Sequence, residues 1–406
     1  MRILIVTQYF WPENFRINDI ALGLVERGHQ VEVLTGKPNY PHGKYYNGYS
    51  FFSKGTEFWN EIKIYRSKLI PRGKSNGFRL MLNYISFAIF SSTRAFFLKE
   101  KFDKILVYEP SPITVGLPAI VYKLKRNTPI YFWVQDLWPQ SVSAAGGIKN
   151  RTLIGLLDNL TRWIYRKSDK ILIQSRSFKE ILIKQEVASE KIIYYPNSVE
   201  EFFKVQKPDI SLLNSLPIGF KIMFAGNIGE SQDFETIIEA ARIVSIRNKS
   251  IKWLILGDGR KKSFVKEKIR EFGLEDQVFL LGSHDVSAMP GYFSCADCLL
   301  VSLKKDYIFS LTIPSKIQSY LACAKPILAS LDGEGGRIIN EANAGFVSEA
   351  ENPQELASKA LEIAILHPNQ LSELGKNSRV YFENNFEREL LITNLEEIME
   401  IQTDGN

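Results

Sequence analysis

The chain has 406 residues, of which 45% are hydrophobic and 24% charged, and its formal net charge is +6. This length exceeds what a single hydrophobic core usually serves, so two domains are expected. The modest charge is spread through both halves and forms no basic tail, so it does not call for a nucleic-acid partner, and none is expected. The charge is compatible with an anionic substrate or a membrane surface.

The N-terminus and the cysteines indicate a cytoplasmic protein. Met1 and Arg2 lead into the apolar run 3–6, which is too short for a signal peptide and has the pattern of a buried strand. The three cysteines, Cys295, Cys298 and Cys323, form no even-numbered disulfide framework. Cys295 and Cys298 make a C-x-x-C, but no second Cys/His pair follows at metal spacing, so we expect packing, with a redox or metal role as the alternative.

Strands and helices are expected to alternate along the first half. Residues 2–7 form a predicted strand, residues 18–27 a helix with apolar residues at helical spacing, and residues 30–35 the next strand. Such a unit predicts a parallel sheet with a right-handed crossover. Further strands are predicted at 104–108, 130–134 and 170–173.

The same pattern restarts near residue 220, with a strand at 220–225 and a helix at 233–244. Further strands are predicted at 252–256, 278–281, 298–302 and 326–329. The simplest fold is α/β, with two Rossmann-like, doubly wound parallel-sheet domains facing a cleft. We expect an N-terminal domain at 1–200, a C-terminal domain at 201–385, and a final helix at 386–406 that crosses back toward the first domain.

Two glycine loops follow strands of the second half, where ligands of open α/β sheets bind. Gly226-Asn227-Ile228-Gly229 precedes a helix, and glycines with helix-start amides suit a phosphate, although a simple tight turn is the alternative. The loop 257–262 places Arg260 and Lys261 at another helix start. Cations there oppose the helix dipole, which favours an anion between them; solvated surface charge is the alternative.

Two later segments of this half are further candidates. Pro314, Ser315 and Lys316 begin a predicted helix at 315–322, where a lysine can meet a diphosphate as a point charge; a plain helix start is the alternative. In the segment 332–337, Glu334 and Gly335 suit hydroxyl recognition beside a closely approaching backbone, or a flexible turn.

Aromatic and polar side chains share two loops of the first half. Glu13, Asn14 and Arg16 lie in the stretch 9–16, and Asp136 and Trp138 lie in the stretch 135–140. This mixture is typical of a sugar-binding wall, although the tryptophans could instead cover the sheet edge. Asp136 is placed to contact sugar or acceptor hydroxyls, or else it caps the following turn. No G-x-G-x-x-G follows the first strand, which argues against a dinucleotide oxidoreductase.

The apolar stretch 79–97 is a candidate membrane contact. Asn83 and Arg94 inside it argue against a spanning helix. An interfacial helix beside anionic lipid and a core helix are both open. The flanking cations are Lys68, Arg72, Lys74, Lys99 and Lys101.

Nearly the whole chain resembles the GT-B, group 1 (family 4) glycosyltransferases. The resemblance is carried, in order, by residues 196–199, 226–229 with 235–241, 256–259, 314–316 with 321–326, and 343–346. It implies a GT-B fold whose C-terminal domain holds a nucleotide sugar, expected to be UDP-linked, with no metal or other cofactor.

Residues 9–16, 34–43 and 136–139 also resemble bacterial O-antigen L-FucNAc transferases. This narrower resemblance implies L-FucNAc as the donor sugar and a polyprenyl-diphosphate-linked saccharide as the acceptor, in O-antigen or capsule synthesis. It also implies peripheral attachment to the inner face of the cytoplasmic membrane.

The chain departs from the family at charged positions. The usual glutamate pair falls on Leu311 and Ser319, and the usual Arg and Lys fall on Asn227 and near Gln232. A non-catalytic nucleotide-sugar-binding protein and a GT-B sugar-nucleotide epimerase therefore stay as alternatives to transfer. The predicted catalytic residues are Asp136 and Lys316. The predicted donor-binding residues are Gly226, Asn227, Gly229, Arg260, Lys261, Ser315, Ser319, Glu334 and Gly335. The predicted acceptor-binding residues are Glu13, Asn14, Arg16 and Trp138.

Overall fold

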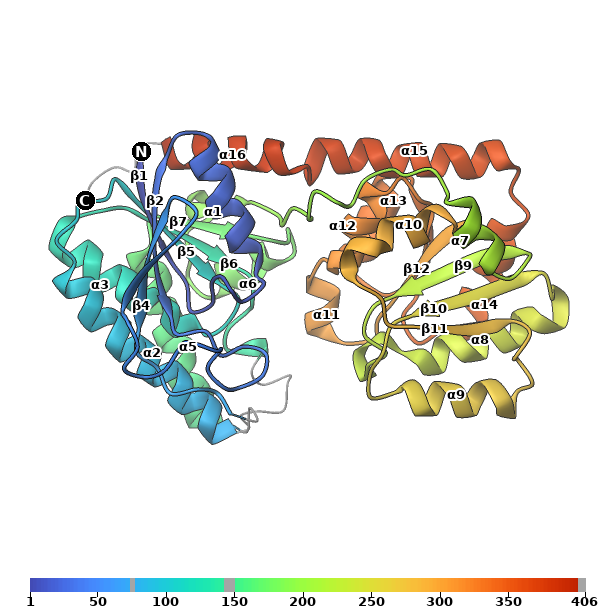
Figure 1. Ribbon diagram of the computed structural model, residues 1–406, viewed down its shortest axis with the longest axis horizontal. Helices are drawn as coiled ribbons and strands as arrows, with labels where there is room; N and C mark the ends of the chain where they lie inside the picture. Colours follow the sequence, from blue (N-terminus) through green and yellow to red (C-terminus); the bar gives the residue numbers. More distant parts are fainter. Residues whose placement is uncertain (74–76, 142–149, 401–406) are drawn as a thin grey trace. The chain divides into compact units, whose positions relative to one another are not determined.

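The computed structural model describes residues 1–73, 77–141 and 150–400. Its chain forms two compact units, Met1–Pro196 with Leu391–Asn406, and Asn197–Leu390. Each unit is a mostly parallel sheet with helices on its faces (Figure 1). The predicted fold of two parallel-sheet α/β domains is confirmed.

The first unit contains an eight-stranded sheet in the order β3-β4-β2-β1-β5-β6-β7-β8. All neighbours are parallel except β3, which runs antiparallel to β4. Sequence patterns did not predict the β3–β4 hairpin, whose exposed edge strand carries few buried residues. The strands are β1 (Arg2–Val6), β2 (Gln30–Gly36), β3 (Thr56–Trp59), β4 (Ile62–Ser67), β5 (Lys104–Glu109), β6 (Ile130–Val134), β7 (Lys170–Ile173) and β8 (Ile192–Tyr194).

The last helix of the chain completes the core of this unit. Apolar residues of α16 pack in one cluster with the central strand β1, and Glu396 on α16 pairs with Arg27 and His29, each at 2.7 Å. The described helices of the unit are α1 (Arg16–Glu26), α2 (Gly77–Phe97), η1 (Ile113–Val115), α3 (Gly116–Arg126), α5 (Arg151–Lys167), α6 (Phe178–Lys184), η2 (Ser189–Lys191) and α16 (Arg388–Glu400).

The second unit contains six parallel strands in the order β11-β10-β9-β12-β13-β14. The chain moves outward from β9 in one direction and then restarts at β12 on its other side. The β9/β12 boundary is therefore the topological switch point, where ligands of such sheets bind. The strands are β9 (Phe220–Ala225), β10 (Ile251–Leu256), β11 (Val278–Gly282), β12 (Cys298–Ser302), β13 (Ile327–Ser330) and β14 (Gly345–Ser348).

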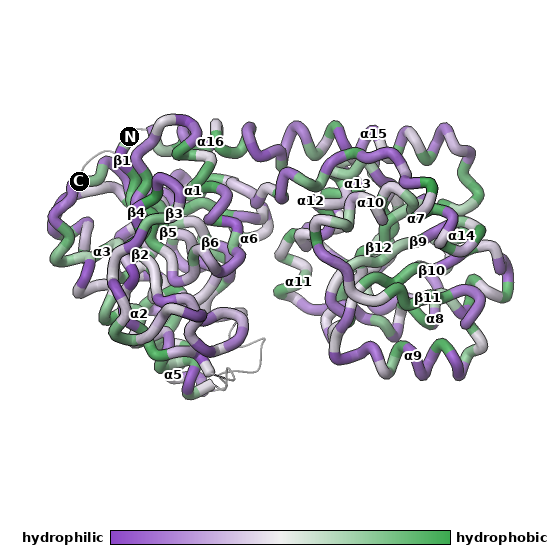
Figure 2. Tube along the Cα trace, in the orientation of Figure 1, coloured by the Kyte–Doolittle hydropathy of each residue, from purple (hydrophilic) through white to green (hydrophobic). Residues whose placement is uncertain are grey.

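Hydropathy follows position in this unit. The inner strand β10 is mostly hydrophobic, whereas the outer helix α15 alternates hydrophilic and hydrophobic residues (Figure 2). The helices are α7 (Ile210–Ser215), η3 (Glu230–Gln232), α8 (Phe234–Arg247), α9 (Lys262–Glu271), η4 (Val286–Ala288), α10 (Met289–Ser294), α11 (Tyr307–Leu311), α12 (Ser315–Ala322), α13 (Glu334–Glu341), α14 (Pro353–Ala364) and α15 (Pro368–Asn385).

Two further predictions concern the cysteines and the membrane. Cys295, Cys298 and Cys323 are all free and buried, which confirms packing as their role. Within the described ranges, no helix has the length and apolar character needed to cross a membrane. Lys74, one of the predicted flanking cations, lies outside the described residues.

Candidate functional site

The candidate site lies at the carboxyl ends of β9, β10 and β12 in the second unit. Two glycine loops meet there backbone to backbone. A Cβ atom on Gly257 would lie 1.8 Å from the carbonyl oxygen of Gly226, and one on Gly259 would lie 2.3 Å from that of Ile228. Gly257 also has a φ of 143°. Only glycine permits this approach, so the two loops pack backbone against backbone as one rigid surface. We call this surface, formed by the loops 226–229 and 257–262, the glycine ledge.

Some amides of the predicted phosphate loop are used within this ledge. The N–H of Gly226 donates to Leu256 at 2.9 Å, and that of Ile228 donates to Asp258 at 2.8 Å. The amides of this loop that we expect to donate to a phosphate are therefore those of Asn227 and Gly229. Gly226 contributes space instead, because a Cβ there would lie 2.7 Å from the Cε atom of Lys316.

Helix α12 delivers Lys316 to the end of β9. Tyr320, one turn further along α12, is buried, and its hydroxyl donates to the carbonyl of Leu300 on β12 at 3.3 Å. The same hydroxyl accepts the amide of Ala225 on β9 at 3.4 Å. Residues four apart share a helix face, so the Tyr320 anchor across the switch point fixes the position of Lys316.

The ammonium group of Lys316 is enclosed and, among the residues that the structure describes, has no carboxylate partner. Its Nζ lies 3.7 Å from the centroid of the Phe224 ring and donates to the side-chain oxygen of Gln232. Burial lowers the pKa of Lys316 to about 7. A cation held in this way at a strand end is suited to receive an anion, since a bound anion would offset this desolvation. Sequence reasoning placed Lys316 here but missed Phe224 as its support.

Two other cations near this site, Lys261 and Lys304, are paired with acids. Lys261 contacts Glu230 at 2.9 Å and Glu235 at 3.0 Å, and Lys304 contacts Glu230 at 2.5 Å. Hydrogen bonding to Glu230 is the main reason why the pKa of Lys261 is raised. Arg260 is exposed. Lys261 was predicted from its glycine loop, whereas Lys304 was missed, although its position after the strand at 298–302 could have indicated it.

Two predicted serines lie on the first turns of α12. Ser315 is exposed at the helix start, and the half-buried Ser319 donates its hydroxyl back to the Ser315 carbonyl at 3.2 Å. This bond leaves the lone pairs of the Ser319 oxygen as acceptors. A ribose hydroxyl would therefore have to donate to Ser319.

Glu334 and Gly335 begin helix α13. The Glu334 carboxylate is buried and forms a bidentate pair with Arg337, at 2.8 and 3.1 Å. A Cβ on Gly335 would lie 2.9 Å from Ile317, so this glycine lets α13 pack against α12. The structure thus gives both residues packing and pairing partners that the predicted hydroxyl recognition did not include.

In the first unit, Glu13 is buried and connects two loops, while its predicted contact with an acceptor stays a prediction. Its Oε1 atom accepts the amides of Asn39 and Tyr40, both at 2.7 Å, so it ties the loop after β2 to the loop after β1. Only 1% of the residue is exposed, and this burial raises its pKa to about 7. The neighbouring Asn14 is exposed.

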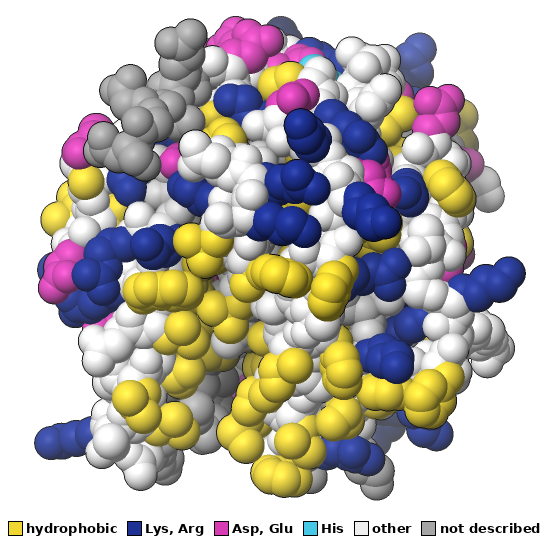
Figure 3. Space-filling model, turned by 90° about the vertical axis from the view of Figure 1, so that its left-hand side faces the viewer, with side chains coloured by type: hydrophobic (Ala, Val, Ile, Leu, Met, Phe, Trp, Pro, Cys, Tyr) yellow, Lys and Arg dark blue, Asp and Glu magenta, His cyan; other side chains and the backbone are white. Residues whose placement is uncertain are grey.

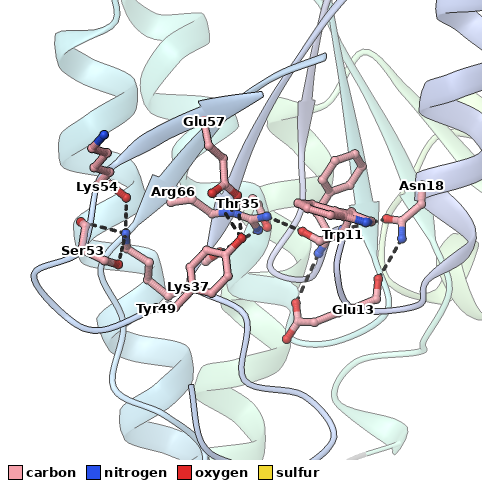
Figure 4. A network of polar contacts seen from close by, with 12 residues as sticks. Trp11, Glu13, Asn18, Thr35, Lys37, Tyr49, Ser53, Lys54, Glu57 and Arg66 are labelled. Atoms are coloured by element: carbon pink, nitrogen blue, oxygen red, sulfur yellow. Dashed lines mark hydrogen bonds and ion pairs between the residues drawn. The ribbon is translucent and has the colours of Figure 1, made fainter. Parts of the chain in front are cut away.

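Two buried cations support the same loops (Figure 4). Arg66 donates to Glu57 at 2.6 Å and also reaches the carbonyl oxygens of Gly36 and Trp11. Lys37 donates to the carbonyl and the hydroxyl of Ser53, and burial lowers its pKa to about 8. These side chains bind the protein's own backbone, so they shape the loops instead of presenting charge to a ligand.

Asp136 follows β6 and is half-buried, and burial raises its pKa. Its carboxylate also interacts with Ser141 and with the amide of Leu137, as predicted for a turn cap. Glu109, at the end of β5, is fully buried, and neither of its carboxylate oxygens has a hydrogen-bond partner among the described residues. Burial raises the pKa of Glu109 well above the usual value. Sequence reasoning did not single out Glu109, although it directly follows the strand predicted at 104–108.

The remaining predicted acceptor residues, Arg16 and Trp138, have different surroundings in the structure. Arg16 is half-buried at the first position of α1 and lies close enough to Tyr108 to lower the pKa of that phenol, against the larger effect of burial. Trp138 is only 5% exposed and packs edge-on against Tyr84 at 6.3 Å. The ring therefore covers the interior in this structure, and its predicted contact with a sugar stays a prediction.

Taken together, the second unit offers a glycine ledge, helix-start amides and a desolvated lysine at its switch point. These groups can hold the phosphates of a nucleotide and stabilise negative charge that develops there. Across the parts of the chain that the structure describes, no group of three His, Cys, Asp or Glu residues is placed to hold a metal ion.

Comparison with known proteins agrees with this geometry. Residues 14–198 match the model of the "glycosyl transferase 4-like domain", and residues 217–381 match that of "glycosyl transferases group 1". The chain is 28% identical over 337 residues to the putative colanic acid biosynthesis glycosyl transferase WcaI of Escherichia coli, covering 79% of this chain and 81% of WcaI. It is 27% identical over 333 residues to the probable glycosyltransferase WbjE of Pseudomonas aeruginosa, covering 79% and 78%.

Among solved structures, Alr3699/HepE of Anabaena in complex with UDP superposes with a TM-score of 0.70. The match covers 99% of this chain and 100% of that one at 14% identity, which supports the shared fold.

Proposed function

The chain belongs to the group 1 glycosyltransferases, and from this premise we propose that it transfers a sugar from a UDP-linked donor to a lipid-linked saccharide in surface-polysaccharide synthesis. The second unit holds the donor, and L-FucNAc is the sugar that we propose. The observation that carries the proposal is Lys316, which lies desolvated at the switch point with a neutral amide as its polar contact.

Lys316 supplies the charge that the family usually places elsewhere. The resemblance puts the usual diphosphate-binding lysine near Gln232, and the Nζ atom of Lys316 reaches the Gln232 side chain from helix α12. In our proposal the ammonium neutralises the departing diphosphate, together with the amides of Asn227 and Gly229. Developing negative charge would strengthen this contact, so it favours the transition state over the ground state.

The first unit contributes the acceptor side. Asp136 is the acid that we propose to contact the incoming hydroxyl, because it is half-buried at the carboxyl end of β6. Burial raises its pKa, which would help it accept a proton from that hydroxyl. A role in surface-polysaccharide synthesis is supported by the name of WcaI, which refers to colanic acid biosynthesis. The lipid-linked acceptor is part of our proposal. In this proposal, transfer takes place at the inner face of the cytoplasmic membrane.

The Lys316→Ala variant tests the donor proposal. We expect UDP affinity to fall by about 10- to 100-fold, the loss typical of one charge-assisted contact. Isothermal titration with UDP measures this change, with Lys266→Ala on the exposed face of α9 as the matched lysine control. Unchanged UDP affinity in Lys316→Ala would remove Lys316 from the site.

Transfer itself is tested with radiolabelled UDP-sugars, including UDP-L-FucNAc, and bacterial membrane lipid as acceptor. Label in the lipid fraction that depends on Lys316 supports transfer. A sugar epimerised without acceptor, or UDP binding with no turnover of any donor, would refute it.

A further inference from the structure

Helix α2 buries several polar side chains and exposes large apolar ones. Its buried residues are Asn83, Ser86 and Ser91 together with Phe87, Ala88 and Ala95. Other large apolar side chains point outward. They are Phe78, Met81, Ile85, Ile89 and Phe96, each 45–67% exposed. A surface helix of a globular protein normally buries such residues.

These outward residues form one continuous stripe. They are spaced by three, four, four and seven positions, so they share one face along a helix of 21 residues. A helix of this length extends for about 30 Å. Exposed apolar patches of this size usually mark a contact with another molecule or with a membrane.

A loop widens the stripe beyond the helix. The ring of Phe51 packs edge-on against Phe90 of α2 at 5.6 Å, and its neighbour Phe52 is 84% exposed. Two elements far apart in the sequence therefore build one apolar surface. We call this surface, Phe52 with the five outward residues of α2, the apolar face.

Lysines border the apolar face. The Nζ atom of Lys68 lies 5.1 Å from the ring centroids of both Phe51 and Phe52, and that of Lys125 on α3 lies 5.2 Å from that of Phe96. Lys99 and Lys101 are exposed just beyond the end of α2, which itself contains no acidic residue. In Figure 3, hydrophobic side chains gather in a broad band, with Lys and Arg side chains along its border.

We propose that the apolar face docks on an anionic lipid bilayer, with α2 lying flat in the interface and Lys68, Lys99, Lys101 and Lys125 contacting the headgroups. Charge complementarity identifies the occupant, because a rim of cations without acids in α2 matches anionic headgroups. Lysine stems can also lie along apolar surface while their ammonium groups stay at headgroup level. That the bilayer carries the acceptor rests on the proposed function; the docking itself does not.

The test uses full-length protein and sedimentation with vesicles of phosphatidylethanolamine and phosphatidylglycerol. We expect the wild type to bind at low salt, to bind less at high salt, and to bind weakly to vesicles of phosphatidylcholine alone. The I85S/I89S variant should lose at least about tenfold in vesicle partition, since two apolar side chains no longer enter the lipid. A K68Q/K125Q variant, which neutralises two of the four lysines, should lose about half of the salt dependence.

The matched control is I218S/I246S, which changes two isoleucines of the second unit that are 94% and 76% exposed. It should bind vesicles like the wild type, and thermal melting should show both double variants folded. Equal vesicle binding by I85S/I89S and wild type would overturn the proposal, as would no binding to anionic vesicles at low salt. A dimer that I85S/I89S disrupts, without vesicle binding, would assign the apolar face to a second copy and overturn it too.

Membrane docking and the proposed transferase function can be tested independently of each other. Vesicle partition needs no donor, and UDP titration needs no lipid. If vesicles bind as expected but no donor is turned over, the docking stands and the function falls. If a detergent-solubilised acceptor is glycosylated while vesicles are not bound, only the docking falls.

Discussion

The two units use the carboxyl ends of their sheets in different ways. In the second unit the loops are built from glycines and backbone, and the polar side chain at their centre, Lys316, contacts a neutral amide and an aromatic ring. In the first unit the corresponding loops are rich in charged side chains, yet Glu13, Lys37 and Arg66 are all at most 1% exposed and bind the protein's own backbone.

The two units therefore differ in the role of their buried charged side chains: one kind is available to bind a ligand, and the other holds the protein's own loops in place. A buried ionic group surrounded by its own partners shapes a loop, and removing one partner destabilises the fold. A desolvated cation whose polar partner is a neutral amide keeps its capacity for an anion. The predictions below test this distinction, beginning with the largest expected effect.

Gly257→Ala should break the ledge of the second unit. The new Cβ would lie 1.8 Å from a carbonyl oxygen, and the backbone φ of 143° is unfavourable for alanine. We expect the free energy of unfolding to fall by about 3 kcal/mol or more, since both a clash and backbone strain are introduced. Chemical denaturation measures the loss.

Gly273→Ala is the control for this substitution. Gly273 also has a positive φ, 61°, but a Cβ added there would meet no described atom within 4 Å, so only the strain of about 1 kcal/mol applies. Similar losses in the two variants would mean that the ledge tolerates a shift of its loops. The rigid backbone site inferred for the second unit would then be wrong.

The second prediction concerns the pH dependence of UDP binding, which tests whether Lys316 of the second unit receives an anion. The free protein has a Lys316 pKa of about 7, and a bound diphosphate would raise this pKa. Above pH 7, binding must therefore be accompanied by proton uptake, so affinity should fall as pH rises, by up to about tenfold per unit until the pKa of the complex is reached. The charge of UDP itself hardly changes there, because the second phosphate pKa is about 6.

Titration calorimetry at several pH values between neutral and alkaline measures this slope, and calorimetry in buffers of different ionisation enthalpy measures the proton uptake. Lys316→Gln should bind weakly at every pH with a nearly flat profile. A wild-type affinity that does not change over this range would show that binding is not coupled to protonation of Lys316, against the lowered pKa of the free protein.

The sequence predicted the second unit better than the first, for a physical reason. A glycine loop after a buried strand has few conformations open to it, so the loops at 226–229 and 257–262 and the helix at 315–322 could be placed from local pattern alone. The contact of Lys316 with Phe224 and Gln232 depends on the packing of α12 against β9, over 80 residues earlier. Local sequence patterns cannot predict contacts between residues so far apart in the chain.

In the first unit, residue type alone did not show which side chains are buried. Glu13 and Trp138 have the composition of a sugar site, but whether a polar or aromatic side chain faces solvent is decided by loops that pack on it from elsewhere. The exposed stripe on α2 shows the converse. Its apolar content was evident from the sequence, but only the tertiary structure shows that Ile85 and Ile89 point outward while Asn83 is buried.

Glu13→Gln gives the smallest expected effect and tests whether this carboxyl is structural. The folded pKa of Glu13 is raised from 4.5 to about 7, so the folded state binds more protons than the unfolded state within that window. The contribution of Glu13 to stability is therefore full below pH 4.5 and is lost as pH rises through 7. The glutamine keeps an oxygen for the amides of Asn39 and Tyr40 without a charge, and the pKa shift corresponds to about 3 kcal/mol. The buried NH2 group of the glutamine offsets part of this gain, so at pH 8 the variant should be more stable than the wild type by about 2 kcal/mol. Glu57→Gln, which removes the carboxylate beside the buried Arg66, should instead lower stability at the same pH. Thermal unfolding from pH 5 to pH 8 distinguishes the two, and parallel curves for wild type and Glu13→Gln would show that Glu13 is already ionised in the fold at pH 5.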